Sequence, residues 1–204
     1  MGRRAKRVTR CARCRMHLGL CVCDAAPHLD VRTRLLLVMH HRETQKNTAT
    51  GHLALMSLAN SELRLHGDRN TPLDLSDVDG TTRRVLLLFP SDDAMPLTRE
   101  FALCDPRPMT LVVPDGNWRQ ASKIGRRVPG LEHAARVKLP PGPLSRYRLR
   151  SESRAEGLAT CEAIARAFGI LETPRVQAQL ESLFDLMVER TLMTRGVQQA
   201  SRAD

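Results

Sequence analysis

The sequence predicts an α/β domain with a mostly parallel sheet. Three short apolar runs end in polar or turn residues, as buried parallel strands do: Thr33–His40, Arg84–Pro90 and Met109–Asp115. Segments with helical spacing of apolar residues alternate with these runs, and such alternation is typical of a parallel sheet covered by helices. The 204 residues are 42% hydrophobic, which is enough for one domain with a sizeable core.

The other elements follow from residue spacing and turn chemistry. Leu53, Met56 and Leu63 suit one face of an amphipathic helix over His52–Leu65. Turn-forming and acidic residues predict a long loop over Gly67–Thr82. The remaining predicted elements, in chain order, are a helix over Trp118–Val128, a strand over Arg136–Leu139, a proline-rich turn over Leu139–Pro143, and helices over Thr160–Phe168 and Arg175–Met193.

The charge of the chain favours an anionic partner. Its 32 Lys and Arg residues outnumber 22 Asp and Glu residues, and the formal net charge is +10. The amino terminus carries a basic run without acidic residues: Arg3, Arg4, Lys6, Arg7, Arg10, Arg13 and Arg15. A GC-rich genome would also raise the arginine content, but a run of this kind is typical of a segment that contacts nucleic acid.

The sequence shows no membrane or targeting signal. No stretch approaches the roughly 18 consecutive apolar residues that span a bilayer. The basic start is followed by cysteines, not by the apolar region of a signal peptide. Lys6 stands where a myristoylation site has Ser or Thr. A cytoplasmic protein without a lipid anchor is therefore expected.

Four cysteines form a dense cluster near the amino terminus. They are Cys11 and Cys14, spaced CxxC, and Cys21 and Cys23, spaced CxC. In a cytosolic chain such thiols are more often metal ligands than disulfides, and four of them suit tetrahedral Zn²⁺. A small zinc knuckle is therefore predicted. Its closed ligand shell would hold structure and perform no chemistry.

Other uses of the cysteines remain open from the sequence. Redox-active thiols or an iron–sulfur cluster would also use the four cysteines, and His17 between the pairs is a possible substitute ligand. Cys104 and Cys161 stand alone and are expected to be buried thiols.

Polar side chains and rare aromatics gather at the predicted strand ends. Ligands of parallel sheets bind at the carboxyl ends of the strands, which brings together His40–Asn47, Phe89–Ala94 and Asp115–Trp118. Aromatic residues make up only 3% of the chain, with one Trp and one Tyr. Trp118 and Tyr147 both lie in loop-like, polar surroundings, and we expect them to line one pocket. The alternative is that Asp115 caps the following helix while Trp118 packs back on the sheet.

Common nucleotide and metal motifs are missing from the sequence. No GxGxxG follows a predicted strand and no GxxxxGK[ST] occurs, so neither a Rossmann dinucleotide site nor a P-loop is supported. No HExxH or second His/Cys cluster suggests a catalytic metal.

The order of the motifs resembles the DTW-domain family over roughly Cys11 to Phe168. The matching blocks are the CxRC and CxC pairs, LLLFPSDDA, DGNWRQA, LPPGPLSRYRLR and GLATCEA, of which DGNW and SRYRLR are the most specific. The chain has Asn117 where the family usually has threonine, so Asn117 is not given the role of that threonine.

The resemblance implies a tRNA-uridine aminocarboxypropyltransferase. It also implies a likeness to SPOUT RNA-modifying enzymes, whose α/β domain contains a trefoil knot that binds S-adenosylmethionine. Asp115 would then lie beside the reacting group. The cofactor-binding residues implied by the family are Phe89, Pro90, Trp118, Leu139, Pro140, Ser145, Tyr147 and Thr160. Arg150 is a further candidate, able to pair with the cofactor carboxylate or with a tRNA phosphate.

The implied chemistry suits these residue types. Uridine N3 must attack the methionyl Cγ beside the sulfonium, and orientation decides which carbon reacts. Aromatic faces attract a sulfonium cation. Asp115 is the candidate general base, or the group that orients the base or the amino end of the cofactor.

Basic residues beside the predicted pocket are expected to contact tRNA phosphates, and salt should weaken this binding. A solvated helix face and an exposed strand edge are the alternative for these side chains. The candidates are Arg119, Lys123, Arg126, Arg127, Arg146 and Arg148.

The sequence thus divides into residues 1–27, a basic arm with the zinc knuckle, and residues 28–204, the catalytic domain. Two other functions remain open. A SPOUT-type RNA methyltransferase would use the same cofactor, and a zinc-dependent RNA-binding module would have no catalytic activity.

Overall fold

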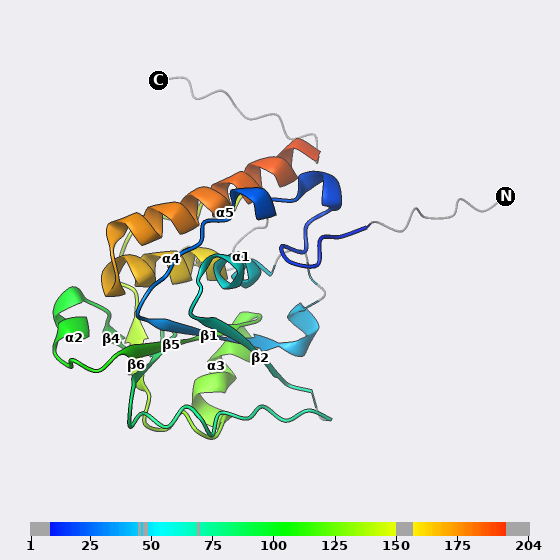
Figure 1. Cartoon of the computed structure of the whole chain (residues 1–204). Coiled ribbons are helices and arrows are strands. Elements are labelled where there is room, and N and C mark those ends of the chain that lie inside the picture. Colours follow the sequence, from blue (N-terminus) through cyan, green and yellow to red (C-terminus); the bar gives the residue numbers. More distant parts are fainter. Residues whose placement is uncertain (1–8, 45, 47–48, 69, 150–156, 195–204) are drawn as a thin grey trace.

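The chain forms a six-stranded sheet in which every pairing is parallel. The computed structural model describes residues 9–44, 46, 49–68, 70–149 and 157–194 (Figure 1). The strand order is β2-β1-β5-β3-β6-β4. The strands are β1 (Arg34–His40), β2 (Ser61–His66), β3 (Arg84–Leu88), β4 (Met95–Pro96), β5 (Met109–Asp115) and β6 (Ala135–Lys138). The parallel α/β fold predicted from the sequence is confirmed.

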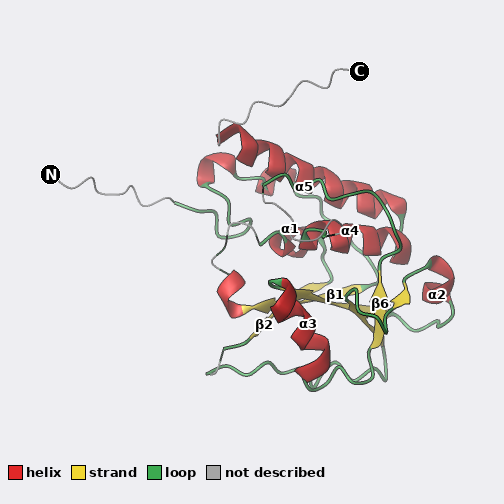
Figure 2. Cartoon of the chain, turned by 180° about the vertical axis from the view of Figure 1, so that it is seen from behind, coloured by secondary structure: helices red, strands yellow, loops and turns green. Residues whose placement is uncertain are grey.

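Helices cover both faces of this sheet. Helices α1, α4 and α5 lie over one face and α3 lies over the other, as the two opposite views show (Figures 1 and 2). The bounds are α1 (Gly51–Ser57), α2 (Arg99–Leu103), α3 (Trp118–Arg127), α4 (Thr160–Leu171) and α5 (Pro174–Thr194), with short 3₁₀ turns at Leu18–Leu20, Cys23–Ala25 and His41–Glu43. The helices predicted after the third strand and at the end of the chain are therefore present.

The central strands are apolar throughout because both of their faces are buried. Leu35, Leu37 and Met39 of β1 join the core under α4, together with Phe168. The intervening Leu36 and Val38 join the core under α3. Alternation along a strand sends successive side chains to opposite faces, so a strand covered twice needs a continuous apolar run.

The predicted helix over His52–Leu65 is wrong in its second half. The helix α1 ends at Ser57, and the segment from Ser61 forms β2, which pairs with β1. The hydroxyl of Ser61 donates to the carbonyls of Leu55 and Leu58, at 3.0 and 2.7 Å. These bonds satisfy carbonyls at the end of the helix. Leu63 lies on this edge strand and remains exposed. The apolar residues of the segment fit the period of a helix as well as that of a strand, so their spacing did not distinguish the two.

The loop predicted over Gly67–Thr82 is confirmed in its described residues, which form neither helix nor strand. Leu75 and Val78 insert into the core under α3. Asp77 pairs with Arg34 at 3.2 Å and with Arg64 at 2.9 Å. The acidic loop is thus attached to the sheet by apolar side chains and by surface ion pairs.

The segment before Pro27 packs against the last helix of the chain. Cys14, Met16 and Val22 share one apolar cluster with residues of α5, including Phe184. The guanidinium of Arg190 donates to the carbonyl of Cys21. Among the described residues, no helix is long and apolar enough to cross a membrane.

Candidate active site at the carboxyl edge of the sheet

Asp115 lies at the carboxyl end of β5, beside Met39 of β1, and is only 6% exposed. Its Oδ1 accepts a hydrogen bond of 2.7 Å from the hydroxyl of Thr160, the first residue of α4. The start of α1 lies close to Oδ2, the other carboxylate oxygen, because a Cβ added to Gly51 would lie 2.9 Å from it. The carboxylate is therefore held in one orientation between two helix starts.

Asn117, not Asp115, caps the helix that follows β5. Its side-chain oxygen accepts from the N–H of Gln120 at 2.9 Å, and the Gln120 side chain accepts from the N–H of Asn117 at 2.8 Å. This reciprocal capping box satisfies two amide groups at the start of α3. The alternative that Asp115 is the cap is wrong, and its carboxylate is left for another role.

Two aromatic side chains meet on the segments that follow β3 and β5. The rings of Phe89 and Trp118 lie 5.0 Å apart between centroids, and Trp118 is 39% exposed. Phe89 also lines a narrow cleft with Leu87 and Gly125, between β3 and α3. Two strand ends predicted to converge therefore present one partly exposed aromatic surface.

Tyr147 is a core residue, which corrects the expectation from its polar surroundings. It is 3% exposed and packs on Phe184 of α5, with ring centroids 5.7 Å apart. The neighbouring arginines and prolines suggested a surface loop, but a contact with a helix almost forty positions later buries the ring. The structure thus holds Trp118 and Tyr147 in different aromatic pairs.

Glu162 organises the loop before Tyr147, and the sequence analysis missed it. The carboxylate is 3% exposed. It accepts from the Ser145 hydroxyl at 2.5 Å, the Arg146 N–H at 2.7 Å and the Ala159 N–H at 2.9 Å. The Tyr147 N–H donates in turn to the Ser145 oxygen, at 3.1 Å. A glutamate at the third position of a helix is half of a capping box, the signal that would have found it.

Replacing Glu162 with glutamine is expected to lower the free energy of unfolding by about 1–3 kcal/mol, because an amide cannot accept all three hydrogen bonds. Urea unfolding measures this loss. Glu181→Gln is the matched control, since Glu181 pairs with the half-exposed side chain of Arg146 at the surface. Equal losses in the two variants would show that Glu162 does not organise the loop.

The sequence of this chain matches a known family over most of its length. The model of the DTW domain matches residues 8–192. The chain belongs to the DTW-domain family.

Curated relatives of this DTW-domain protein share one name, tRNA-uridine aminocarboxypropyltransferase 2. The Drosophila melanogaster relative is 28% identical over 173 residues, which cover 82% of this chain and 68% of the relative. The Macaca fascicularis relative is 30% identical over 174 residues and the Mus musculus relative 29% over 177, covering 82% of this chain in each case. The matched region spans 58% of each of these two relatives, so they are longer proteins.

One solved structure was also found, titled "Structure of the SAM-dependent rRNA:acp-transferase Tsr3 from Vulcanisaeta distributa". It aligns with a TM-score of 0.48 and 14% identity over 79% of each chain. The family assignment of this DTW-domain protein rests on the sequence match alone.

The remaining cofactor-binding residues predicted for this DTW-domain protein lie in the loop after β6, apart from Pro90, which follows β3. Leu139 is partly buried against the core and Pro140 is exposed, as is Pro90 in the loop after β3. Ser145 is held by Glu162 as described. Arg150 lies outside the described residues.

The predicted tRNA-binding arginines and lysine fall into different environments. Arg119 and Lys123 are exposed on α3, one turn apart, and Arg148 is exposed beyond the loop. Arg146 bridges two acidic residues of α5, Glu181 at 2.9 Å and Asp185 at 2.7 Å. Its charge is therefore already paired within the protein. The side chains of Arg126 and Arg127 lie outside the described part of the chain, as do Arg3, Arg4, Lys6 and Arg7.

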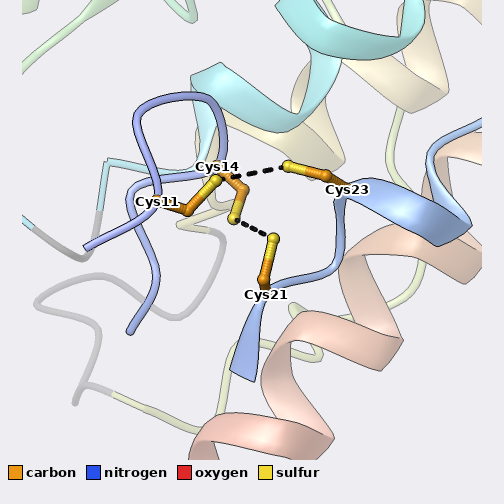
Figure 3. A group of neighbouring side chains, drawn as sticks. All are labelled: Cys11, Cys14, Cys21 and Cys23. Carbon is orange, nitrogen blue, oxygen red and sulfur yellow. Dashed lines mark hydrogen bonds between the residues drawn. The ribbon is translucent and has the colours of Figure 1, made fainter. Parts of the chain in front are cut away.

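The four amino-terminal cysteines converge, and their sulfurs all lie within 4.8 Å of one another. Figure 3 shows the two pairs facing each other, with Cys11 to Cys23 at 3.5 Å and Cys14 to Cys21 at 3.7 Å. Tetrahedral zinc with Zn–S bonds of about 2.3 Å spaces its sulfurs by about 3.8 Å, so the cluster fits such an ion. The cluster is able to hold a metal.

The thiols of this cluster differ in acidity before any metal binds. Hydrogen bonds from the backbone of Cys14 and Arg13 lower the pKa of the Cys11 thiol to about 6. Burial, followed by contacts with the neighbouring thiols, raises the pKa of Cys23 to about 12, and burial raises that of Cys14. Of these three thiols, Cys11 is thus the one that forms a thiolate at the lowest pH.

The two isolated cysteines and His17 lie outside the four-cysteine cluster. Cys161 is buried, as predicted, but Cys104 is exposed at the end of α2, so that prediction is wrong. The short helix α2 lies at the rim of the fold and leaves Cys104 uncovered. His17 accepts from the N–H of Gly19 at 3.1 Å and caps the first 3₁₀ turn. It is not part of the cluster able to hold a metal.

Proposed function

We propose that this protein transfers the 3-amino-3-carboxypropyl group of S-adenosylmethionine to N3 of a uridine in tRNA. The observation that carries the proposal is the family match over residues 8–192, with relatives that bear the name of this activity. The geometry supports it. A buried, oriented carboxylate and a partly exposed aromatic pair follow neighbouring strands at one edge of the sheet.

Asp115 is the proposed base or orienting group. S-adenosylmethionine supplies the electrophilic Cγ next to its sulfonium. The N3–Cγ bond forms as the Cγ–S bond breaks, its electron pair stays on sulfur, and methylthioadenosine leaves. The carboxylate of Asp115 takes the N3 proton or orients the group that does. The Thr160 hydroxyl holds Asp115 in place through its hydrogen bond.

Phe89 and Trp118 are proposed to face the sulfonium, because an aromatic face attracts a cation. The segments after β3, β5 and β6 complete the proposed cofactor site, since these strands lie side by side in the sheet order β5-β3-β6. The proposal includes a trefoil knot formed by these segments, structural zinc on the four cysteines, and a cytoplasmic location. Residues 1–27 and 28–204 are the proposed arm and catalytic domain.

Incubation with unmodified tRNA and S-adenosylmethionine tests the function, followed by mass spectrometry of the nucleosides and the small product. Aminocarboxypropyl-uridine together with methylthioadenosine is the expected result. Methylated uridine with S-adenosylhomocysteine would show the alternative, an RNA methyltransferase. No modified nucleoside and no binding of S-adenosylmethionine would favour a non-catalytic RNA-binding module.

The two rare aromatics should respond differently to removal. Trp118→Ala is expected to weaken S-adenosylmethionine binding about tenfold with little change in stability, because the ring is partly exposed. Tyr147→Ala is expected to lower the free energy of unfolding by about 3–5 kcal/mol, because its ring is buried against Phe184. Calorimetric titration and urea unfolding measure the two effects. An unfolding loss of similar size in Trp118→Ala would contradict this separation.

A further inference from the structure

A second concave surface lies away from the carboxyl edge, between the cysteine knuckle, α1 and the start of β2. Its volume is about 450 Å³, within the range that holds a small ligand. Ser61 begins β2, so this groove reaches the amino ends of the strands, opposite the proposed catalytic site. The residues that line it are Arg13, His28, His52, Leu55, Met56, Leu58, Ala59 and Ser61.

His52 is one of the residues that line this groove, and its side chain carries a buried polar atom. The residue is 7% exposed, and its Nε2 has no hydrogen-bond partner among the residues that the structure describes. Burial, with the nearby charge of Arg15 as a smaller cause, lowers the pKa of His52 and favours the neutral ring. A buried polar atom without a partner is costly, so a ligand that forms a hydrogen bond to it gains affinity.

The rest of the lining combines an apolar wall with positive charge. Leu55, Met56 and Leu58 provide the wall. Arg13 contributes a guanidinium, His28 adds a second imidazole at an exposed position, and no lining residue is acidic. A flat apolar group with an attached anion is complementary to this combination. A nucleotide is such a group, because its base stacks on apolar side chains and its phosphate pairs with arginine.

We infer that this groove binds an unpaired nucleotide of the tRNA, at a distance from the uridine that reacts. The base lies against Leu55 and Met56, an edge of the base bonds to His52 Nε2, and the phosphate pairs with Arg13. The inference rests on the proposed function, since it assigns the same substrate a second contact. It also gives the knuckle a part in substrate binding, because Arg13 stands between two of its cysteines.

Two substitutions test the groove without altering the proposed catalytic residues. Ala59→Glu places a negative charge at an exposed position of the groove, and Arg13→Ala removes the guanidinium while keeping its backbone N–H. Leu103→Glu is the matched control, since Leu103 is 71% exposed on α2, beyond the opposite edge of the sheet. Fluorescence anisotropy with pooled unmodified tRNA transcripts measures RNA affinity, and calorimetry measures S-adenosylmethionine affinity.

Both groove variants are expected to bind tRNA about tenfold more weakly, and Arg13→Ala should also reduce the slope of log K against log salt by about 0.7 to 0.9. S-adenosylmethionine affinity and the control variant should be unchanged. Wild-type tRNA affinity in both groove variants would overturn the inference. A different result would contradict the proposed function: the wild-type protein would form no aminocarboxypropyl-uridine.

Discussion

Replacing Asp115 with asparagine is expected to slow aminocarboxypropyl transfer by about 100-fold or more, because a positioned base contributes about 10² to 10⁴ to the rate. Asparagine has nearly the shape of aspartate, and its carbonyl oxygen is able to keep the hydrogen bond from Thr160. The fold and the aromatic pair of Phe89 and Trp118 should therefore remain intact. Single-turnover rates with saturating S-adenosylmethionine measure the effect.

Asp93→Asn is the control for this prediction. Asp93 follows β3 near the same edge of the sheet, but its side chain is 58% exposed and pairs with Arg136 at the surface. This variant should transfer at the wild-type rate. If Asp115→Asn binds S-adenosylmethionine normally and also keeps the full rate, the carboxylate is neither the base nor an essential orienting group.

Loss of the proposed structural zinc is expected to destabilise the protein by at least about 3 kcal/mol, because binding of structural zinc contributes on the order of 10–16 kcal/mol in small zinc domains. Cys14→Ser removes one ligand from the cluster. Cys14 is also 6% exposed and belongs to the apolar cluster that contains Tyr147 and Phe184. The substitution should therefore also destabilise the loop that Glu162 organises.

Elemental analysis of the purified protein and urea unfolding measure this effect. The wild-type chain should carry one zinc ion, and Cys14→Ser should carry less and unfold at lower urea. Cys104→Ser is the control, since Cys104 is an exposed thiol outside the cluster. Equal metal content and stability in Cys14→Ser and the wild type would rule out a structural metal on these cysteines.

Local patterns were sufficient to predict the buried elements. The runs that became β1, β3 and β5 are apolar because both faces of the sheet are covered, and no other common element has that pattern at that length. The meeting of Phe89 and Trp118 followed from the parallel order of the strands. The cysteine cluster followed from spacing alone.

The errors come from contacts between distant parts of the chain. Leu63 and Leu65 fit a helical or a strand period equally well, and only pairing with β1 decides between them. Tyr147 is buried against α5, and the carboxylate of Glu162 accepts a hydrogen bond from Ser145, in a loop seventeen residues earlier. The position of Glu162 in the first turn of α4 marks it as half of a capping box, but nothing in the nearby sequence specifies these distant partners. The β4 strand has two residues and α2 has five, which is too short for any periodicity.

The packing of the cysteine knuckle on α5 has a consequence for synthesis of the protein. The knuckle leaves the ribosome well before Phe184 and Arg190, which pack against it from the other end of the domain. Metal binding is able to order the knuckle early, but its apolar side stays uncovered until α5 has been translated. A truncated chain that ends before α5 would therefore display this surface, and such an unfinished product is prone to aggregation and degradation.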